Sequence, residues 1–332
     1  MNSANLNTVK PVLPATEYLL KEISGKADYQ IINACKIAIL SFGSKTDAEE
    51  LLQHFLQNPT DPFTGDLLEI VGAWGEQSHA EALFSFSITE GELNENFPEA
   101  VLEILGQLQY APAKPILAHY VFNSSEYYLN KAAVLGLLNF DCEEYREEIK
   151  KSITSVLGKN LFPEYLPALI CKLDDRKDLL EQLYNSGSTT ISTDCNAGIF
   201  LGFSLCGKEG KTYFKKALFD PNWEAFYNAS RSVLQGLAHL NITFEELMQD
   251  AGEVKDEKQL QYHMLVLISL LELKADSYEA KEESFEKIYR DLIATGHLTT
   301  LAEKAGQLHD AERVEGLLIL RLREEILMGS KR

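Results

Sequence analysis

Residues 210–212 of the chain read Gly-Lys-Thr and match the end of a phosphate-binding loop. In such a loop, backbone N–H groups and a lysine hold the phosphates of a nucleotide. The motif also needs a glycine five residues earlier, where this chain has Leu205, and a strand leading into the loop. No strand is predicted there, so we interpret Gly210-Lys211-Thr212 as a turn between two helices.

A second stretch, residues 202–206, reads Gly-Phe-Ser-Leu-Cys and lacks the final glycine of a nucleophile elbow. An elbow also requires a strand before the serine, and none is predicted here. A catalytic role for Cys206 would need a nearby histidine and a lowered pKa. A buried cysteine is the preferred interpretation.

Histidine spacing gives no sign of a metal site. No two histidines form a His-x3-His pair, and none forms a His-Glu step that would place two ligands on one helix face. We therefore predict no catalytic residues, no bound metal and no cofactor. The seven histidines are His54, His79, His119, His239, His263, His297 and His309.

The charge balance narrows the class of partner. The chain has 50 acidic and 31 basic residues, for a formal net charge of -19. Proteins that bind nucleic acid gain affinity by placing Lys and Arg on phosphates, so this balance argues against nucleic acid and against anionic membranes. It favours encounter with a basic partner.

Compartment follows from the cysteines and from hydropathy. The five cysteines form no Cys-x-x-Cys pair, which favours free thiols in a reducing compartment. Residues 1–14 lack the apolar core of a signal peptide, and no apolar run is long enough to span a bilayer. These features predict a cytoplasmic protein.

The elements expected around these stretches are helices in a repeated order. Apolar residues recur at intervals of three and four, with no pattern typical of a strand. Thr16 and Asp47 are predicted to cap the starts of two early helices. A small or polar residue near the end of each second helix marks the repeat, with steps of 31, 34, 30, 66 and 33 residues. The markers are Ser41, Gly72, Gly106, Gly136, Gly202 and Gln235.

The step of 66 is twice 33, so a further unit should lie between Gly136 and Gly202. Residues 163–174 supply its second helix. Each unit would contain two helices of about 12 residues, which are marginal alone and gain stability by stacking. The small residues 132, 133 and 136 indicate a place where a neighbouring helix comes close.

Three segments carry a resemblance to a known family. Asp61-Pro62 followed by Ile70-Val71-Gly72, Asp220-Pro221 followed by Ala229 and Arg231, and residues 132–136 together resemble HEAT-like repeats. The resemblance implies an all-α fold: an α-solenoid of about eight or nine antiparallel helix pairs, forming a curved or superhelical rod. It also implies that second helices line the concave side.

On this basis residues 1–14 are a flexible leader and residues 15–332 are a single HEAT-like domain, with residues 274–332 as a divergent cap. The predicted function is a non-enzymatic scaffold or adaptor that binds a basic protein or peptide on the concave face. The candidate binding residues are polar positions on second helices: Asp66, Glu69, Glu99, Glu103, Asn130, Lys131, Asn196 and Arg231.

Three alternatives remain open. The chain could be an immunity-type inhibitor that neutralises a basic toxin or nuclease by charge complementarity. It could be an enzyme on the same scaffold, with a metal or nucleotide in the groove. It could also be a structural subunit of a larger assembly. The sequence leaves the oligomeric state open, with a monomer as one option.

Overall fold

The computed structural model describes residues 11–25, 28–188, 193–223 and 230–256, together with positions 259, 263, 266, 267 and 270. These residues are mostly helical, which confirms the all-α prediction. The chain divides into two compact units, Met1–Ile149 and Lys150–Arg332. The predicted leader lies mostly outside the described residues, and the predicted cap lies entirely outside them. The prediction of one continuous domain stays a prediction.

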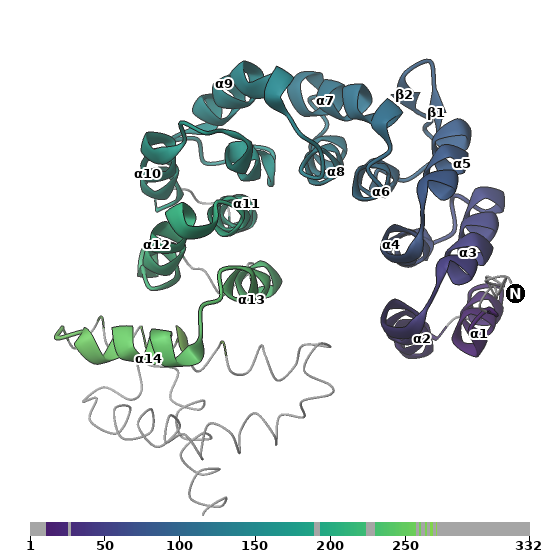
Figure 1. Ribbon diagram of the computed structural model, residues 1–332, viewed down its shortest axis with the longest axis horizontal. Helices are drawn as coiled ribbons and strands as arrows, with labels where there is room; N and C mark the ends of the chain where they lie inside the picture. Colours follow the sequence, from purple (N-terminus) through teal and green to yellow (C-terminus); the bar gives the residue numbers. More distant parts are fainter. Residues whose placement is uncertain are drawn as a thin grey trace, which may run out of the picture. The chain divides into compact units, whose positions relative to one another are not determined.

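The first unit is built from helices that pair in sequence order. Helices α1 and α2, α3 and α4, and α7 and α8 pack against each other, and α2, α4, α6 and α8 also contact one another in succession (Figure 1). The helices are α1 (Pro14–Ile23), α2 (Tyr29–Phe42), α3 (Lys45–Gln57), α4 (Thr64–Trp74), α5 (Gln77–Ser87), α6 (Ala100–Gln107), η1 (Ala111–Ala113), α7 (Lys114–Asn123), α8 (Tyr127–Leu137) and η2 (Glu143–Tyr145).

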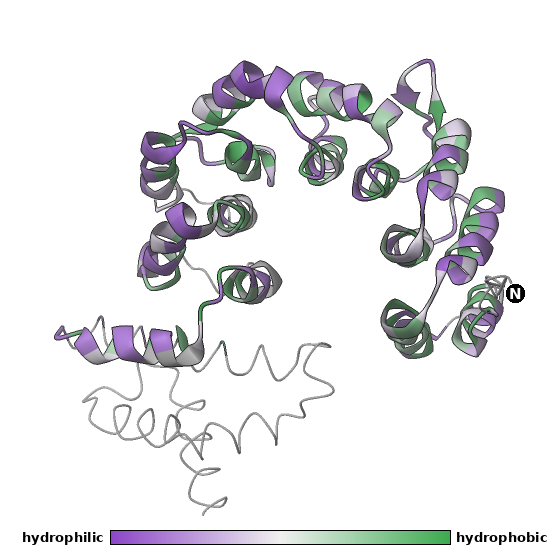
Figure 2. Cartoon of the chain, viewed as in Figure 1, coloured by the Kyte–Doolittle hydropathy of each residue, from purple (hydrophilic) through white to green (hydrophobic). Residues whose placement is uncertain are grey.

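Helices α2, α4, α6 and α8 are more apolar than α1, α3 and α5, as the colours of Figure 2 show. Each of these four helices contacts a neighbour among the four more extensively than α1, α3 and α5 contact one another, in addition to its partner helix. A helix covered on several sides needs a wider apolar surface than one with a face in water.

A close helix crossing in the first unit joins α6 and α8 at two glycines. A Cβ added to Gly106 would lie 2.2 Å from Cα of Gly136, and one added to Gly136 would lie 2.6 Å from the carbonyl oxygen of Leu102. The backbones therefore approach more closely than any side chain would allow. This confirms the close approach predicted from the small residues around Gly136.

A short hairpin corrects the prediction that the chain has no strands. Strands β1 (Ile88–Thr89) and β2 (Glu92–Leu93) pair antiparallel, with Ile88 opposite Leu93. The turn between them has φ of 54° at Glu90 and 86° at Gly91. Two successive residues with positive φ are typical of a two-residue hairpin turn.

Asp47 does not cap a helix as the sequence suggested, because α3 begins at Lys45. Its fully buried carboxylate accepts hydrogen bonds from Leu13 N at 2.7 Å, Thr16 Oγ1 at 2.7 Å and Ser44 Oγ at 2.8 Å. Thr16 lies inside α1 and makes one of these bonds rather than capping the helix. Asp47 thus joins the start of α1 to the start of α3.

The second unit continues the helical order with one irregular element. Residues predicted as a regular second helix instead form the 3-10 helix η3, which has Pro167 in its first turn. The other elements are α9 (Arg146–Val156), which crosses the boundary between the units, η3 (Leu166–Lys172), α10 (Lys177–Gly187), α11 (Thr193–Leu205), α12 (Gly207–Leu218), η4 (Pro221–Trp223), α13 (Ser230–His239) and α14 (Phe244–Glu253).

Contacts between neighbouring helices recur at similar sequence separations in both units. Lys36 contacts Asp66, 30 residues away, and the Trp74 side chain donates to the Ile39 carbonyl, 35 residues away. In the second unit, Arg176 contacts Glu209, 33 residues away. In each of these contacts, the two residues are 30 to 35 positions apart.

In the part of the chain that the structure describes, no helix has both the length and the apolar character needed to cross a bilayer.

Candidate functional site

Two of the predicted binding residues, Asp66 and Glu69, lie on α4 and share one lysine. Lys36 Nζ on α2 is 2.8 Å from Oδ1 of Asp66 and 3.0 Å from Oε2 of Glu69. Burial alone would lower the pKa of Lys36, but the hydrogen bonds to both carboxylates raise it above its ordinary value. The three side chains form a partly exposed ion-pair cluster across two adjacent helices.

The next predicted residues lie on α6 and α8, which belong with α2 and α4 to the set of second helices in the helix pairs. Glu99 is exposed at the start of α6, and Glu103 is partly exposed one turn later, where Gln107 donates to it at 3.0 Å. Lys131 is partly exposed on α8. With Glu69, these residues place partly exposed charged groups on three successive second helices.

Two predicted surface residues are buried instead. Asn130 and Asn196 are only 2% and 3% exposed. Asn130 donates to the Val121 carbonyl at 2.8 Å, and Asn196 donates to the Trp223 carbonyl at 3.0 Å. Both amides satisfy backbone groups of an adjacent segment, so their placement on a binding surface was wrong. Arg231 belongs to α13, and its side chain lies outside the described residues.

Large exposed aromatic rings also lie on these second helices. Phe42 at the end of α2 is 69% exposed, and Tyr128 at the start of α8 is 74% exposed. Exposed aromatic rings beside charged groups are common anchors in protein interfaces. Sequence reasoning missed both rings, because an apolar residue near a helix end looks the same whether it is buried or exposed.

A second candidate site is a cleft of about 810 Å³ within the second unit, beside α12. Helix α12 has two distinct faces. Gly210, Phe214, Ala217 and Leu218 are buried on one face. The cleft is lined from the other face, where lysines recur at helical spacing. These lysines are Lys208, Lys211, Lys215 and Lys216.

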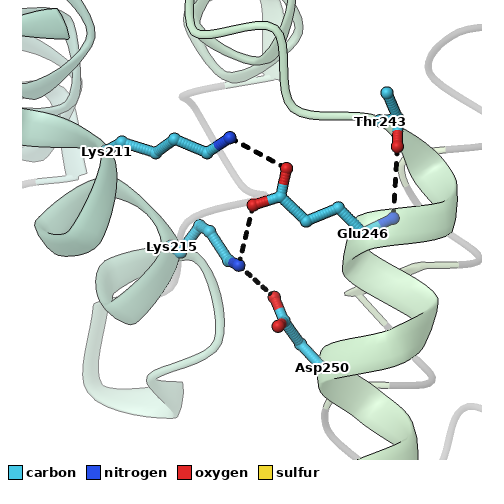
Figure 3. A network of polar contacts seen from close by, with 5 residues as sticks. All are labelled: Lys211, Lys215, Thr243, Glu246 and Asp250. Carbon is cyan, nitrogen blue, oxygen red and sulfur yellow. Dashed lines mark hydrogen bonds and ion pairs between the residues drawn. The ribbon is translucent and has the colours of Figure 1, made fainter. Parts of the chain in front are cut away.

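Two of the lysines bind α14. Lys211 Nζ is 2.8 Å from Glu246, and Lys215 Nζ is 3.0 Å from Glu246 and 2.5 Å from Asp250 (Figure 3). Thr243 caps α14 by accepting from the backbone N–H of Glu246, which fixes the first turn of that helix. Each helix contributes charges four residues apart, so the two pairs face each other.

These contacts shift the pKa values of Glu246 and Lys215. The hydrogen bond from Lys211 lowers the pKa of Glu246, and Lys215 lowers it further. Burial alone would lower the pKa of Lys215, but Asp250 and Glu246 raise it. Both shifts favour the charged forms of Glu246 and Lys215 at neutral pH.

Aromatic groups close other parts of the cleft. The rings of Phe219 and His263 stack with centroids 4.1 Å apart. Burial lowers the pKa of His263, so its ring is neutral at pH 7. Tyr184 donates to Asp220 at 2.9 Å, and burial together with that carboxylate raises the pKa of Tyr184 to about 12.

The Gly-Lys-Thr stretch and Cys206 do not lie in the settings that a phosphate loop or a catalytic thiol requires. Gly210, Lys211 and Thr212 are inside α12, so the predicted turn was wrong and no loop is present there. Burial and the neighbouring Cys171 raise the pKa of Cys206 to about 12, which keeps it a thiol at neutral pH. Among the described residues, no group of three or more His, Cys, Asp or Glu side chains could hold a metal ion.

No family model matches the chain, and comparisons with curated proteins and with solved structures also gave no match.

Proposed function

We propose that the chain is an α-solenoid of HEAT-like helix pairs that binds a protein partner of basic character along its second helices. The recurring contacts about 30 to 35 residues apart support the repeat, since in such arrays each unit touches only its neighbours. The helix pairs and the row formed by α2, α4, α6 and α8 are consistent with it.

The observation that carries the binding proposal is a set of partly or fully exposed groups on the successive helices α2, α4, α6 and α8. Glu69 on α4 and Glu99 at the start of α6 are about one period apart in sequence. Glu103 lies one helical turn after Glu99 on α6. Phe42 and Tyr128 add exposed rings on α2 and α8. An extended partner could contact several helices at once, with carboxylates steering a basic segment and rings providing buried contact area.

Charge reversal on α6 tests this proposal. We expect Glu99→Lys combined with Glu103→Lys to weaken capture of a basic partner from the source cell by about tenfold or more, because two attractive charges become repulsive. The measurement is quantitative affinity capture, followed by titration of the purified partner at two salt concentrations.

The matched control reverses two exposed carboxylates on first helices, Glu50→Lys on α3 and Glu81→Lys on α5. This control should bind the partner like the unmodified chain. Equal loss in both double variants would show a general charge effect and would contradict binding along the second helices. Failure to recover any salt-sensitive protein partner would contradict the proposal as a whole.

A further inference from the structure

Four lysines line the cleft beside α12, and only two of them form ion pairs between helices of the described chain. Lys211 and Lys215 on α12 form ion pairs with Glu246 and Asp250 on α14, and these pairs hold the two helices together. Lys208 and Lys216 have no such role: within the described residues, no ion pair joins either lysine to a carboxylate. Lys216 instead lies over two aromatic rings, 5.8 Å from the ring centroid of Tyr184 and 5.7 Å from that of Tyr213.

The carboxylates of the cleft are already engaged. Glu246 contacts Lys211 and Lys215, Asp250 contacts Lys215, and Asp220 accepts from Tyr184 and from the backbone of Asn222. Among the described residues, an incoming anion would therefore meet two lysines that pair with no carboxylate. Beside them lie Glu246 and Asp250, which are paired with lysines, and Asp220, which keeps its charge and is held by Tyr184 and Asn222.

Placing four lysines on one helix face has a cost. Lysines three or four residues apart repel each other by a few tenths of a kcal/mol per pair. The chain as a whole has a net charge of -19, so general charge balance does not account for a local basic surface. Ion pairing with α14 offsets the cost for Lys211 and Lys215 only.

We propose that this cleft binds a small phosphate-bearing anion through Lys208 and Lys216, with the hydroxyl of Thr212 between them. Position 212 is four residues from each lysine, so the three side chains follow one face of α12. Lysine ammonium groups suit phosphate oxygens as compact charges. A volume of about 810 Å³ is within the range of small-ligand sites.

The ion-pair network would position the site rather than contact the ligand. Glu246 and Asp250 hold α14 against α12, and the stacked rings of Phe219 and His263 close the cleft without adding charge. No covalent step is part of this proposal. It is independent of partner binding in the first unit, because all of its residues lie in the second.

Isothermal titration calorimetry of the full chain with tripolyphosphate, ATP and citrate tests the site. We expect the two phosphate compounds to bind and citrate to bind at least about tenfold more weakly. Lys208→Gln combined with Lys216→Gln should weaken binding of the phosphate compounds by about tenfold for each lysine removed. Circular dichroism and a melting curve would confirm that the variant is folded.

The matched control removes two lysines of the first unit, Lys21→Gln and Lys45→Gln, both of which are exposed. This control should bind tripolyphosphate like the unmodified chain. Absence of binding by all three anions would overturn the proposal. So would equal binding of citrate and tripolyphosphate, or equal loss of binding in the two double variants.

Discussion

At the scale of single residues, Asp47 shows how one buried charge can organise a helix pair. Its carboxylate has no exposed surface and accepts from Leu13, Thr16 and Ser44. A buried carboxylate is tolerated only when several donors satisfy it. Burial alone would raise the pKa of Asp47, but these hydrogen bonds lower it below its ordinary value.

We predict that Asp47→Asn lowers the free energy of unfolding by about 1–3 kcal/mol, because hydrogen bonds to a charged acceptor are replaced by weaker ones. Chemical denaturation followed by circular dichroism measures the change. The control Glu50→Gln changes an exposed carboxylate on the same helix and should alter stability by less than about 0.5 kcal/mol.

The same residue predicts a pH dependence with a defined sign. Because the folded-state pKa of Asp47 is lowered, its contribution to stability is present above the ordinary value of about 4. The contribution is lost as the pH falls through the folded-state pKa. The stability difference between the unmodified chain and Asp47→Asn should therefore shrink below about pH 4, and a constant difference from pH 3 to 7 would contradict this role.

Asn130 and Asn196 show where residue-level prediction fails. A polar residue on a helix is exposed by default, and the sequence gives no sign of which carbonyl lacks a donor. The Val121 and Trp223 carbonyls become accessible to these amides only through the packing of an adjacent segment. By contrast, Asp66, Glu69, Glu99 and Glu103 could be placed at least partly on the surface, because each follows or flanks a regular apolar pattern.

At the scale of elements, the close approach of two helices was predictable from one pair of small residues. Gly106 and Gly136 meet as their 30-residue separation suggested. Helix type was less predictable in the next unit. The segment expected to be a regular helix is the 3-10 helix η3, while Gly210 lies inside α12 although glycine is unfavourable in helices.

We predict that Gly106→Ala lowers the free energy of unfolding by about 1–3 kcal/mol. The added Cβ would meet backbone atoms of Gly136, which cannot move aside as a flexible side chain could. This cost exceeds the gain of about 1 kcal/mol that alanine normally brings to a helix. Thermal and chemical denaturation measure the balance.

Gly65→Ala is the matched control, because Gly65 lies in α4 and an added Cβ there meets nothing within 4 Å. It should be neutral or slightly stabilising. If Gly106→Ala were as stable as Gly65→Ala, the close crossing of α6 and α8 would not be present in solution.

At the scale of the whole molecule, fold class was the most predictable property, because the all-α pattern depends on many residues and no single error changes it. The chain divides into two compact units, Met1–Ile149 and Lys150–Arg332, but no change in amino-acid composition marks the boundary between them. The cleft beside α12 was also missed, although Lys208, Lys211 and Lys215 recur at helical spacing. Its formation depends on how α14 packs against α12, and the spacing of the lysines does not show which carboxylates will face them.

We predict that destabilisation stays within a unit. In Gly106→Ala, hydrogen exchange measured by mass spectrometry should become faster in α4, α6 and α8, which contact one another. Exchange in α11 and α12 should change little, since stability in arrays of neighbour contacts is local. A uniform increase along the chain would show that the two units unfold as one.

The fixed separation between touching segments has a consequence for insertions and deletions. Adding one residue inside α4 would rotate every following position of that helix by about 100° and would move Glu69 away from Lys36. Adding a complete stretch of about 30 residues, as a new helix pair, would instead preserve the register on both sides. We therefore expect the protein to tolerate the insertion or deletion of a whole period far better than that of a single residue.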